Sequence, residues 1–395
     1  MGRVPGALFT GLIGIGLLFG ASTSGASSTR AEAAPVVHGD LESVSCAAPN
    51  NCVAVGSKSK AAFADHWNGS SWNAVTLTSP SANRTLYLSS VSCVNAFNCT
   101  AVGTNALKGF SGGRPGFWLT LVEHWNGTTW SMVPSPNRAV LGNDLAGISC
   151  TRADDCIAVG TSVVRSNRLN FTRSKTLVEK WNGSHWTIVP SPNGPFAVNS
   201  LSHIACTSTT NCWAAGGSAE AQPPVRGEVS LLEHWNGLTW STTSRPEMQE
   251  INSLSCPSVD DCTAVGQSGS TIVTIVTQHW NGSTWSIVKT SGVPNEFLGD
   301  IYCFSPVSCT AVGTTGTGFA MTYIGYTLVV HWNGSVWSIV LSPPIEEVSG
   351  PSQAEDTLDG IACTSASDCT AVGVATDGTA LIEHWNGTIW SIVQR

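Results

Sequence analysis

The chain has 395 residues, only 11% of which are charged, and its formal charge is −8. Soluble domains usually contain roughly 25% charged residues, so this surface is polar but weakly charged. The acidic balance argues against a nucleic-acid partner, because such domains usually present a basic stripe. Length alone would predict two or three ordinary domains, but the internal repetition described below replaces that expectation.

Residues 1–33 are predicted to be a secretory signal peptide and a short spacer. Arg3 precedes an apolar run of about fifteen residues, followed by small residues with candidate cleavage sites at Ser24–Ala26 and Ala31–Ala33. An uncleaved membrane anchor is the alternative, but a spanning helix needs roughly 20 apolar residues. We therefore expect a secreted, extracellular protein with no membrane attachment after cleavage.

The cysteines indicate disulfides. All fourteen fall into pairs with five residues between the partners, and an even count behind a signal peptide is typical of disulfide bonding. Zinc is the alternative, but a tetrahedral site needs about four converging ligands, and these pairs are well separated along the chain. The predicted disulfides are Cys46–Cys52, Cys93–Cys99, Cys150–Cys156, Cys206–Cys212, Cys256–Cys262, Cys303–Cys309 and Cys363–Cys369.

One unit is repeated seven times. Each copy reads approximately L-x-x-[IVL]-[SAY]-C-x5-C-x-A-[VA]-G and later H-W-N-G-x-x-W-S, with a variable stretch after each part. In the second copy, strands are predicted at 88–93, 99–103, 121–125 and 129–133, because these runs alternate or are rich in β-formers. The Asn126–Gly127 dipeptide predicts a tight turn between the last two strands, since both residues accept positive φ.

Four antiparallel strands per unit, repeated seven times, predict an all-β fold, a seven-bladed β-propeller with a disulfide in the first hairpin of each blade. A solenoid is the alternative, but solenoids have atypical terminal repeats, and the first and last units here are ordinary. Ring closure should rest on packing of blade 7 against blade 1, unless residues 35–40 add a strand. The predicted propeller spans residues 34–395, with blades at about 38–77, 85–135, 143–191, 198–243, 250–290, 297–342 and 356–395.

These motifs resemble two groups of bacterial propellers. The repeat is similar to secreted Asp-box (BNR-type) propellers, including the seven-bladed photosystem II assembly-factor type. Gly127, Thr129 and Trp130 align with the glycine, threonine and tryptophan of that box, while Trp125 stands where its aspartate would be. The H-W-N-G-x-x-W-S hairpin also resembles that of the seven-bladed fucose-binding lectins, which lack the cysteine pairs. Both resemblances imply the fold for all seven units.

The repeated polar and aromatic residues are interpreted as structural. A glutamate such as Glu123 precedes the histidine in several copies, and adjacent strand residues point to opposite faces, so the two cannot chelate one ion. The histidine, and tryptophan pairs such as Trp125 and Trp130, should pack between blades, with sugar binding as the alternative. The matches to the N-glycosylation pattern follow from the Asn-Gly turns. The residues before the tryptophan are His66, His124, Lys180, His234, His279, His331 and His384.

The variable stretches should gather on one face of the ring, opposite the cysteine hairpins and Asn-Gly turns, and such loops usually carry function. The loops of units 2 and 3 contain basic and aromatic residues: Lys108, Phe110, Arg114, Phe117, Trp118, Arg165, Arg168, Phe171, Arg173 and Lys175. Units 5 to 7 place acids there: Glu296, Asp300, Glu346, Glu347, Glu355, Asp356 and Asp359. Long surface loops also collect charge without any function, and the two interpretations stay open.

The sequence contains no nucleophile elbow, zinc-binding HExxH motif, phosphate loop or calcium loop. We therefore assign no catalytic residue, cofactor or metal, and expect a monomeric, non-enzymatic protein that binds an extracellular polysaccharide or protein through its variable-loop face. The alternatives are a multivalent lectin with sites between blades, and a hydrolase or lyase with carboxylates or histidines at the central mouth. The predicted ligand-binding residues are Arg114, Trp118, Arg165, Arg168, Phe171, Arg173, Tyr323 and Tyr326.

Overall fold

The computed structural model describes twelve stretches of the second of two compact units, Val36–Arg395. These stretches contain 29 β-strands and no helix. Accordingly, no helix in the described part is long and apolar enough to cross a membrane. The described residues are 39–58, 61–77, 83–107, 118–138, 141–165, 172–221, 228–243, 250–268, 274–288, 296–317, 324–343 and 354–394.

The strands form seven sheets, and each sheet uses four strands that are consecutive in the chain and antiparallel. Blades 1 to 4 comprise β1 (Asp40–Ala48), β2 (Asn51–Lys58), β3 (Ala61–Trp67), β4 (Trp72–Thr76); β5 (Arg84–Asn95), β6 (Asn98–Leu107), β7 (Leu119–Trp125), β8 (Trp130–Met132); β9 (Gly142–Arg152), β10 (Asp155–Arg165), β11 (Thr172–Trp181), β12 (Trp186–Ile188); β13 (Val198–Ser208), β14 (Asn211–Ala219), β15 (Glu228–Trp235) and β16 (Trp240–Thr242).

Blades 5 to 7 comprise β17 (Glu250–Ser258), β18 (Asp261–Ser268), β19 (Thr274–Trp280), β20 (Trp285–Val288); β21 (Glu296–Ser305), β22 (Ser308–Thr317), β23 (Ile324–Trp332), β24 (Trp337–Val340); β26 (Thr357–Ser365), β27 (Asp368–Val374), β28 (Ala380–Trp385) and β29 (Trp390–Gln394). One further strand, β25 (Ala354–Glu355), pairs in parallel with β23. The all-β, seven-bladed propeller predicted from the repeats is confirmed.

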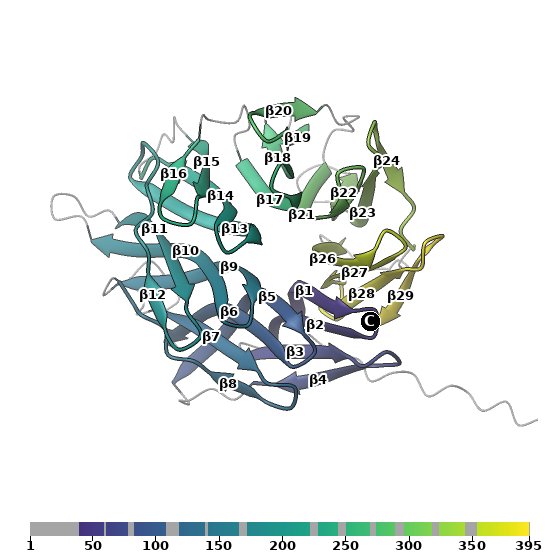
Figure 1. Cartoon of the computed structure of the whole chain (residues 1–395). Helices are drawn as coiled ribbons and strands as arrows, with labels where there is room; N and C mark the ends of the chain where they lie inside the picture. Colours follow the sequence, from purple (N-terminus) through teal and green to yellow (C-terminus); the bar gives the residue numbers. More distant parts are fainter. Residues whose placement is uncertain are drawn as a thin grey trace, which may run out of the picture. The chain divides into compact units, whose positions relative to one another are not determined.

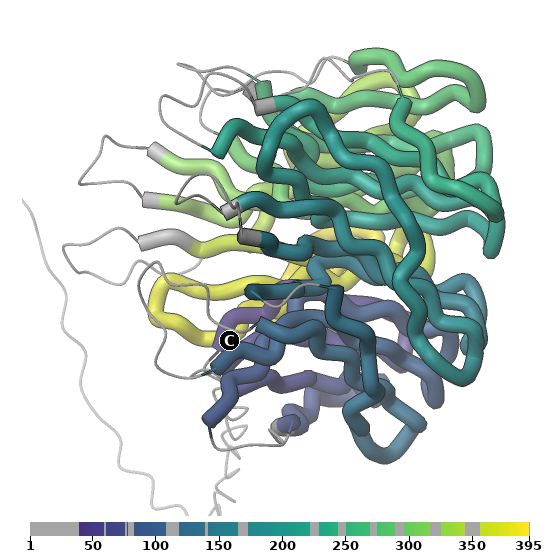
Figure 2. Tube along the Cα trace, turned by 90° about the vertical axis from the view of Figure 1, so that its left-hand side faces the viewer, coloured from purple at the N-terminus to yellow at the C-terminus, as the bar shows by residue number. Residues whose placement is uncertain are grey.

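The blades stand in a ring around a central channel (Figure 1). The first strand of each blade lies innermost and contacts the first strand of the next blade, while the short fourth strand lies outermost. The two hairpin turns of each blade lie on one face of the ring (Figure 2). We call this surface the hairpin face.

The Asn-Gly turns have the geometry that the dipeptide predicts. Their seven glycines have φ between 87° and 97°, a region that L side chains rarely adopt. The asparagine is also required, because its side chain closes the turn. In blade 2, Asn126 Oδ1 accepts hydrogen bonds from the backbone N–H groups of Thr128 and Thr129, both at 3.0 Å.

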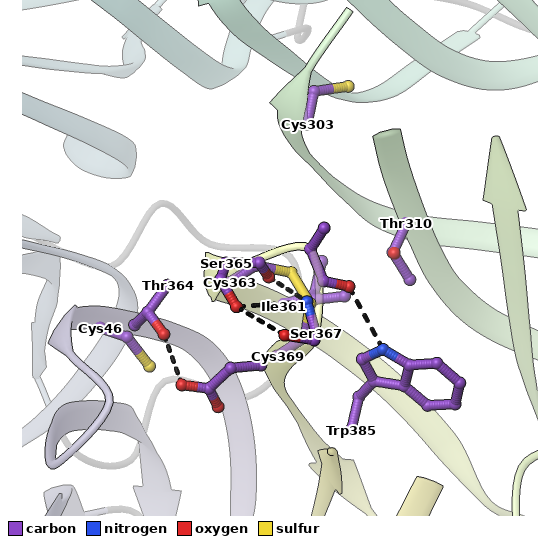
Figure 3. The surroundings of a disulfide bond; sticks show 12 residues. Cys46, Cys303, Thr310, Ile361, Cys363, Thr364, Ser365, Ser367, Cys369 and Trp385 are labelled. Atoms are coloured by element: carbon purple, nitrogen blue, oxygen red, sulfur yellow. Dashed lines mark hydrogen bonds between the residues drawn. A yellow bond between two sulfur atoms is a disulfide. The ribbon is translucent and has the colours of Figure 1, made fainter. Parts of the chain in front are cut away.

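A disulfide closes the first hairpin of every blade, as predicted. The seven Cα–Cα distances are 3.9 to 4.0 Å. The first tryptophan of the W-N-G motif fastens the same turn, because its indole N–H donates to a backbone carbonyl inside the cysteine loop. Figure 3 shows blade 7, where Trp385 donates to the carbonyl oxygen of Ala366 at 3.3 Å beside the Cys363–Cys369 disulfide.

Every innermost strand contains a β-bulge at the first variable position of the L-x-x motif. In blade 4 the ladder shifts between Leu201 and His203, so Ser202 is the extra residue. The bulge brings the Ser200 carbonyl oxygen to within 2.1 Å of where a Cβ on Gly216 would lie. Gly216 ends the C-x-A-[VA]-G motif, so the bulge explains why the motif ends in glycine.

The hydrophobic core is divided into seven clusters, and each cluster lies at the seam between two neighbouring blades. The second tryptophan of several blades is buried in these seams, which confirms its predicted packing role. Blades 7 and 1 meet in the same way, without strand exchange between the described residues. Gly39 N–H donates to the Gly378 carbonyl oxygen at 3.1 Å, and the Gln394 amide donates to Asp65 at 2.8 Å. Packing therefore closes the ring.

Candidate functional site

The innermost strands of all seven blades enclose a central cavity of about 530 Å³. Ligand pockets usually have volumes of about 300 to 1,000 Å³, so the cavity is large enough for a ligand. Its wall extends from the bulge positions to the cysteine hairpins, where Pro257 and Phe304 line it. The cavity therefore occupies the half of the channel next to the hairpin face.

Within its conserved part, the repeat varies at two positions on the innermost strand, and in every blade at least one of the two lines this cavity. The bulge residue and the residue after it lie on the innermost strand, and their chemistry differs from blade to blade. The seven copies thus supply one common scaffold with different side chains around the channel. The pairs are Glu42–Ser43, Ser89–Ser90, Ala146–Gly147, Ser202–His203, Asn252–Ser253, Gly299–Asp300 and Asp359–Gly360.

Some of these residues connect neighbouring blades. Between blades 1 and 2, the backbone N–H of Val91 donates to Ser43 Oγ at 3.3 Å. Between blades 6 and 7, Asp300 occupies the equivalent place, and its Oδ2 accepts from the Ile361 N–H at 2.9 Å. The other oxygen of Asp300 accepts from the Ser253 hydroxyl of blade 5 at 2.6 Å. The Asp300 carboxylate is therefore bound to three blades and acts as a structural connection.

Glu42 and Asp359 are the other carboxylates of the cavity wall, and they belong to the adjoining blades 1 and 7. Burial, with the nearby charges of Asp359 and Asp40, raises the pKa of Glu42 to about 7. Burial also raises the pKa of Asp359 to about 6, although a hydrogen bond from the Thr357 hydroxyl at 2.8 Å opposes this. Glu42 has no hydrogen-bond partner among the described residues, and solvent in the channel reaches its side chain.

His203 lines the cavity from blade 4. Burial lowers its pKa, and the carboxylate of Asp300 opposes this only in part, so the ring is neutral at neutral pH. The described wall contains no lysine or arginine. The negative charge of the cavity is therefore not compensated by a cation of the described wall.

Two acids expected on the variable-loop face are buried, and two others line the central cavity. Glu296 and Asp356 are buried, and Asp356 accepts a hydrogen bond from the backbone N–H of Thr376 at 2.8 Å. Asp300 and Asp359 lie on β21 and β26 and line the central cavity. The prediction was wrong for Asp300 and Asp359, because each lies within an innermost strand and not in the loop before it.

Three side chains of the predicted ligand-binding set are described. Trp118 is 41% exposed, Tyr326 is 39% exposed, and Arg173 is also exposed. Each lies near the start of the third strand of blade 2, 3 or 6, at the edge of the ring opposite the hairpin face. The structure describes the backbone of Arg165 at the end of β10. Outside the described residues lie the side chain of Arg165 and all of Arg114, Arg168, Phe171 and Tyr323.

The third strands direct alternate side chains into two seams, as predicted. The glutamate faces the preceding blade: the Ser191 hydroxyl of blade 3 donates to Glu233 Oε2 of blade 4 at 2.6 Å. The histidine faces the following blade: the Trp130 indole of blade 2 donates to His66 Nε2 of blade 1 at 3.0 Å. Both residue types therefore pack between blades.

The seam glutamates are deeply buried. Burial raises the pKa of each of four of them to about 7, and hydrogen bonds from serines such as Ser191 oppose the shift in three seams. A protonated carboxyl group avoids placing a charge in the hydrophobic seam. The four residues are Glu123, Glu179, Glu233 and Glu383.

Six of the seven residues before the W-N-G motif have a described partner, which lies on the following blade in two cases and on the same blade in four. His66 packs on Trp125 with ring centroids 4.2 Å apart, and Lys180 lies 5.6 Å above the ring of Trp235. The other four residues each contact a side chain of their own blade. These pairs are His234 with Trp213 at 4.5 Å between ring centroids, His279 with Asp261 at 2.9 Å, His331 with Thr310 at 3.3 Å and His384 with Asp368 at 2.8 Å.

The seam between blades 2 and 3 contains a cavity of about 190 Å³, lined by His124, Thr100, Trp181 and Trp186 among others. The Nδ1 atom of His124 is buried and has no hydrogen-bond partner among the described residues. This space lies where the lectin alternative expects a sugar. Its volume is below the range of about 300 to 1,000 Å³ usual for ligand pockets.

Sequence reasoning missed the two positions that build the central cavity and the serines of the seams. The cavity positions are the x-x of the L-x-x motif, and their variability inside a conserved phrase could have identified them. The seam serines precede a proline in the repeated phrase P-S-P-N at 134–137 and 190–193. Within the described stretches, no group of three or more His, Cys, Asp or Glu side chains is placed to hold a metal ion.

Comparison with known proteins identifies the fold but not a family. No family model matches the chain, and no curated protein sequence matches it. Among solved structures, YCF48 bound to D1 peptide is 12% identical, with a TM-score of 0.51 over 89% of this chain and 92% of that chain. The GH74 xyloglucanase from Xanthomonas campestris is 11% identical, with a TM-score of 0.58 over 92% of this chain and 56% of that chain. At these identities the likeness concerns the propeller fold alone.

Proposed function

We propose that the protein is a secreted, non-enzymatic binding propeller, and that the central cavity is its main recognition site. The observation that carries the proposal is the coincidence of a cavity of about 530 Å³ with the positions at which the seven copies differ. A repeated scaffold supplies rigidity, and function is expected where the repetition stops. Seven disulfides suit an oxidising, extracellular compartment.

The fold neighbours support a binding role of this kind. One of them is bound to a peptide and the other is a xyloglucanase, so this architecture accommodates both protein and polysaccharide ligands. An extracellular protein segment or a carbohydrate is therefore the proposed partner class.

The proposal is tested by filling the cavity. Ala146 lines the cavity at the bulge of blade 3, so Ala146→Trp places an indole in the channel. Leu238→Trp is the matched control, because Leu238 is 84% exposed in the Asn-Gly turn of blade 4. Wild type and both variants are screened against a displayed random-peptide library and a glycan array. The proposal is supported if a ligand of the wild type still binds to Leu238→Trp but no longer binds to Ala146→Trp. No ligand at all, or equal binding by both variants, contradicts it.

The basic and aromatic patch on the variable-loop face is a second proposed binding surface. Trp118 and Arg173 are exposed on the neighbouring blades 2 and 3. Changing Arg165, Arg168, Arg173 and Trp118 to Ala should weaken binding of a ligand that uses this face. Unchanged affinity for every ligand of the protein would remove the patch.

The lectin alternative is favoured by the cavity of about 190 Å³ at the seam between blades 2 and 3. Under this alternative the W-N-G hairpin functions like that of the fucose-binding lectins, with His124 and Trp181 contacting a sugar. His124→Ala should then abolish glycan-array binding, while Leu238→Trp leaves it unchanged. Glycan binding that survives His124→Ala would exclude this site.

The hydrolase alternative is favoured by the electrostatically coupled carboxylates of Glu42 and Asp359 in the central cavity. A carboxyl group with a pKa near neutrality is suited to general acid catalysis. Hydrolysis of a polysaccharide by the wild type that Glu42→Gln abolishes would establish an enzyme. If Glu42→Gln keeps the same hydrolytic activity, then Glu42 does not catalyse the reaction.

A further inference from the structure

The charge of the central cavity is concentrated on one side. Glu42 and Asp359 lie on adjoining blades, and their charges, with that of Asp40, act on one another. The third carboxylate of the wall, Asp300, already accepts three hydrogen bonds from protein groups. A cation placed between Glu42 and Asp359 would remove their mutual repulsion, so the wall is electrostatically complementary to a positive group.

An apolar track leads outward from the cavity over blade 6. Phe304 lines the cavity mouth and is 49% exposed, Val307 in the cysteine hairpin is 61% exposed, and Val336 in the Asn-Gly turn is 57% exposed. The two turns are in contact, since a Cβ on Gly334 would lie 2.9 Å from Val307 Cγ1. Exposed apolar side chains gathered in this way mark an interaction surface.

We propose that the cavity and this track together bind an extended peptide with one lysine or arginine side chain. The basic side chain enters the cavity toward Glu42 and Asp359, and neighbouring apolar side chains of the peptide lie on Phe304, Val307 and Val336. The inference rests on the proposed function and names its partner.

The chemistry of the wall favours a peptide over other ligands. An anionic polymer would meet carboxylates without a compensating cation of the described wall. A neutral sugar usually needs an aromatic surface, and the described wall offers only Tyr302, which also packs against the cluster between blades 6 and 7, and Phe304 at the mouth. A basic side chain followed by apolar residues matches both the carboxylates and the track.

The first test is selection of ligands from a displayed library of random heptapeptides. The full chain is used as wild type, as Glu42→Gln/Asp359→Asn and as Asp260→Asn, which removes a charge from an exposed turn of the hairpin face outside the cavity. We expect wild type and Asp260→Asn to enrich peptides with lysine or arginine at one position and apolar residues beside it. The double variant should lose this enrichment. Enriched peptides without a basic residue, or equal enrichment by all three proteins, would overturn the proposal.

The second test measures the affinity of one selected peptide by fluorescence anisotropy. Replacing its basic residue by norleucine should raise Kd at least about tenfold, because loss of one charge-assisted contact costs more than 1 kcal/mol. The Glu42→Gln/Asp359→Asn variant should show a similar loss while unfolding at the wild-type temperature. An unchanged Kd in either experiment contradicts the proposal.

The apolar track is tested with the same peptide. Phe304→Ala and Val307→Ser should each raise Kd about tenfold, whereas Leu238→Ser, in blade 4 on the same face of the ring, should leave it unchanged.

Different results would contradict the proposed function and the proposed cationic peptide. If Ala146→Trp leaves ligand binding unchanged, the proposed function is contradicted. If Ala146→Trp blocks binding but the ligands are glycans or uncharged peptides, only the proposal of a cationic peptide is contradicted.

Discussion

The seams between blades and the central cavity are built from the same seven copies, yet they use repetition in opposite ways. In the seams, every copy supplies a tryptophan pair and a hydrophobic cluster, and four of the seven also supply a glutamate, so the junctions are built alike. Around the cavity, no two blades have the same pair of residues at the bulge, although serine recurs in several. The difference indicates that repetition serves stability and that departures from it serve recognition. Substitutions in the two regions should therefore affect different measurements.

The largest effect is expected for Gly216→Ala. Its Cβ would lie 2.1 Å from the Ser200 carbonyl oxygen, so the bulge of blade 4 must shift. We expect the free energy of unfolding to fall by about 4 kcal/mol in urea titrations. The neighbouring residue provides the control, since a Cβ on Gly217 would have nothing nearer than Val229 O at 4.0 Å. Equal destabilisation by Gly216→Ala and Gly217→Ala would show that the bulge does not require glycine.

The seams should also make stability depend on pH. Each seam glutamate has a pKa of about 7 in the folded protein, against 4.5 for an ordinary glutamate, so the fold holds its proton more tightly. Stability is therefore full below pH 4.5 and is lost as the pH rises toward 7. We expect each seam glutamate to contribute a loss on the order of 2 to 3 kcal/mol between about pH 5 and about pH 8 in urea titrations.

Substitution of the seam glutamates measures how much of the pH dependence of stability they cause. Glu179→Gln/Glu233→Gln keeps an amide oxygen for the serine hydrogen bonds and removes both titrating groups. The pH slope of this variant should be about half the wild-type slope or less, while that of Asp260→Asn should be unchanged. A stability that rises between pH 5 and pH 8 would contradict the burial of these carboxyl groups.

A single disulfide should contribute less. Cys150→Ser/Cys156→Ser opens one short hairpin loop, and loop closure of this size stabilises by about 2 kcal/mol. Differential scanning calorimetry should record a lower Tm with ligand affinity unchanged, because this change leaves the carboxylates of the cavity in place. A loss of affinity larger than the loss of folded protein would show that the hairpin itself takes part in binding.

The smallest effect on stability is expected for Glu42→Gln/Asp359→Asn. These side chains line the cavity and do not fill a seam, and their removal relieves mutual repulsion. The free energy of unfolding should change by less than about 0.5 kcal/mol at neutral pH. A destabilisation comparable to that of Gly216→Ala would make these carboxylates part of the scaffold and remove the contrast between the two regions.

The fold could be predicted because its determinants are local and repeated. Asn126 and Gly127 dictate a turn by their own conformational preferences, and the cysteine pairs lie opposite each other across a short hairpin. The role of Gly216 was not predictable from turn chemistry, because it depends on a carbonyl oxygen of the neighbouring strand.

The candidate site was harder to predict for the same physical reason. Asp300 and Asp359 are close in space because the ring brings blades 6 and 7 together. In the sequence, each stands just after a variable stretch, so the pattern predicts a loop there. The β-bulge places Glu42 at the wall of the channel. The sequence of a single repeat does not indicate that a bulge occurs there or that its residue faces the channel. The variable-loop patch stays a prediction.

The central claim is that ligands bind where the repetition stops, in the central cavity. It is tested most directly by calorimetric titration of one selected ligand into wild type, Ala146→Trp and Leu238→Trp. We predict that Kd is unchanged for Leu238→Trp and rises at least about 100-fold for Ala146→Trp, because the indole occupies the cavity. Equal affinity of the two variants would contradict the claim and direct the search to the seams or to the variable-loop face.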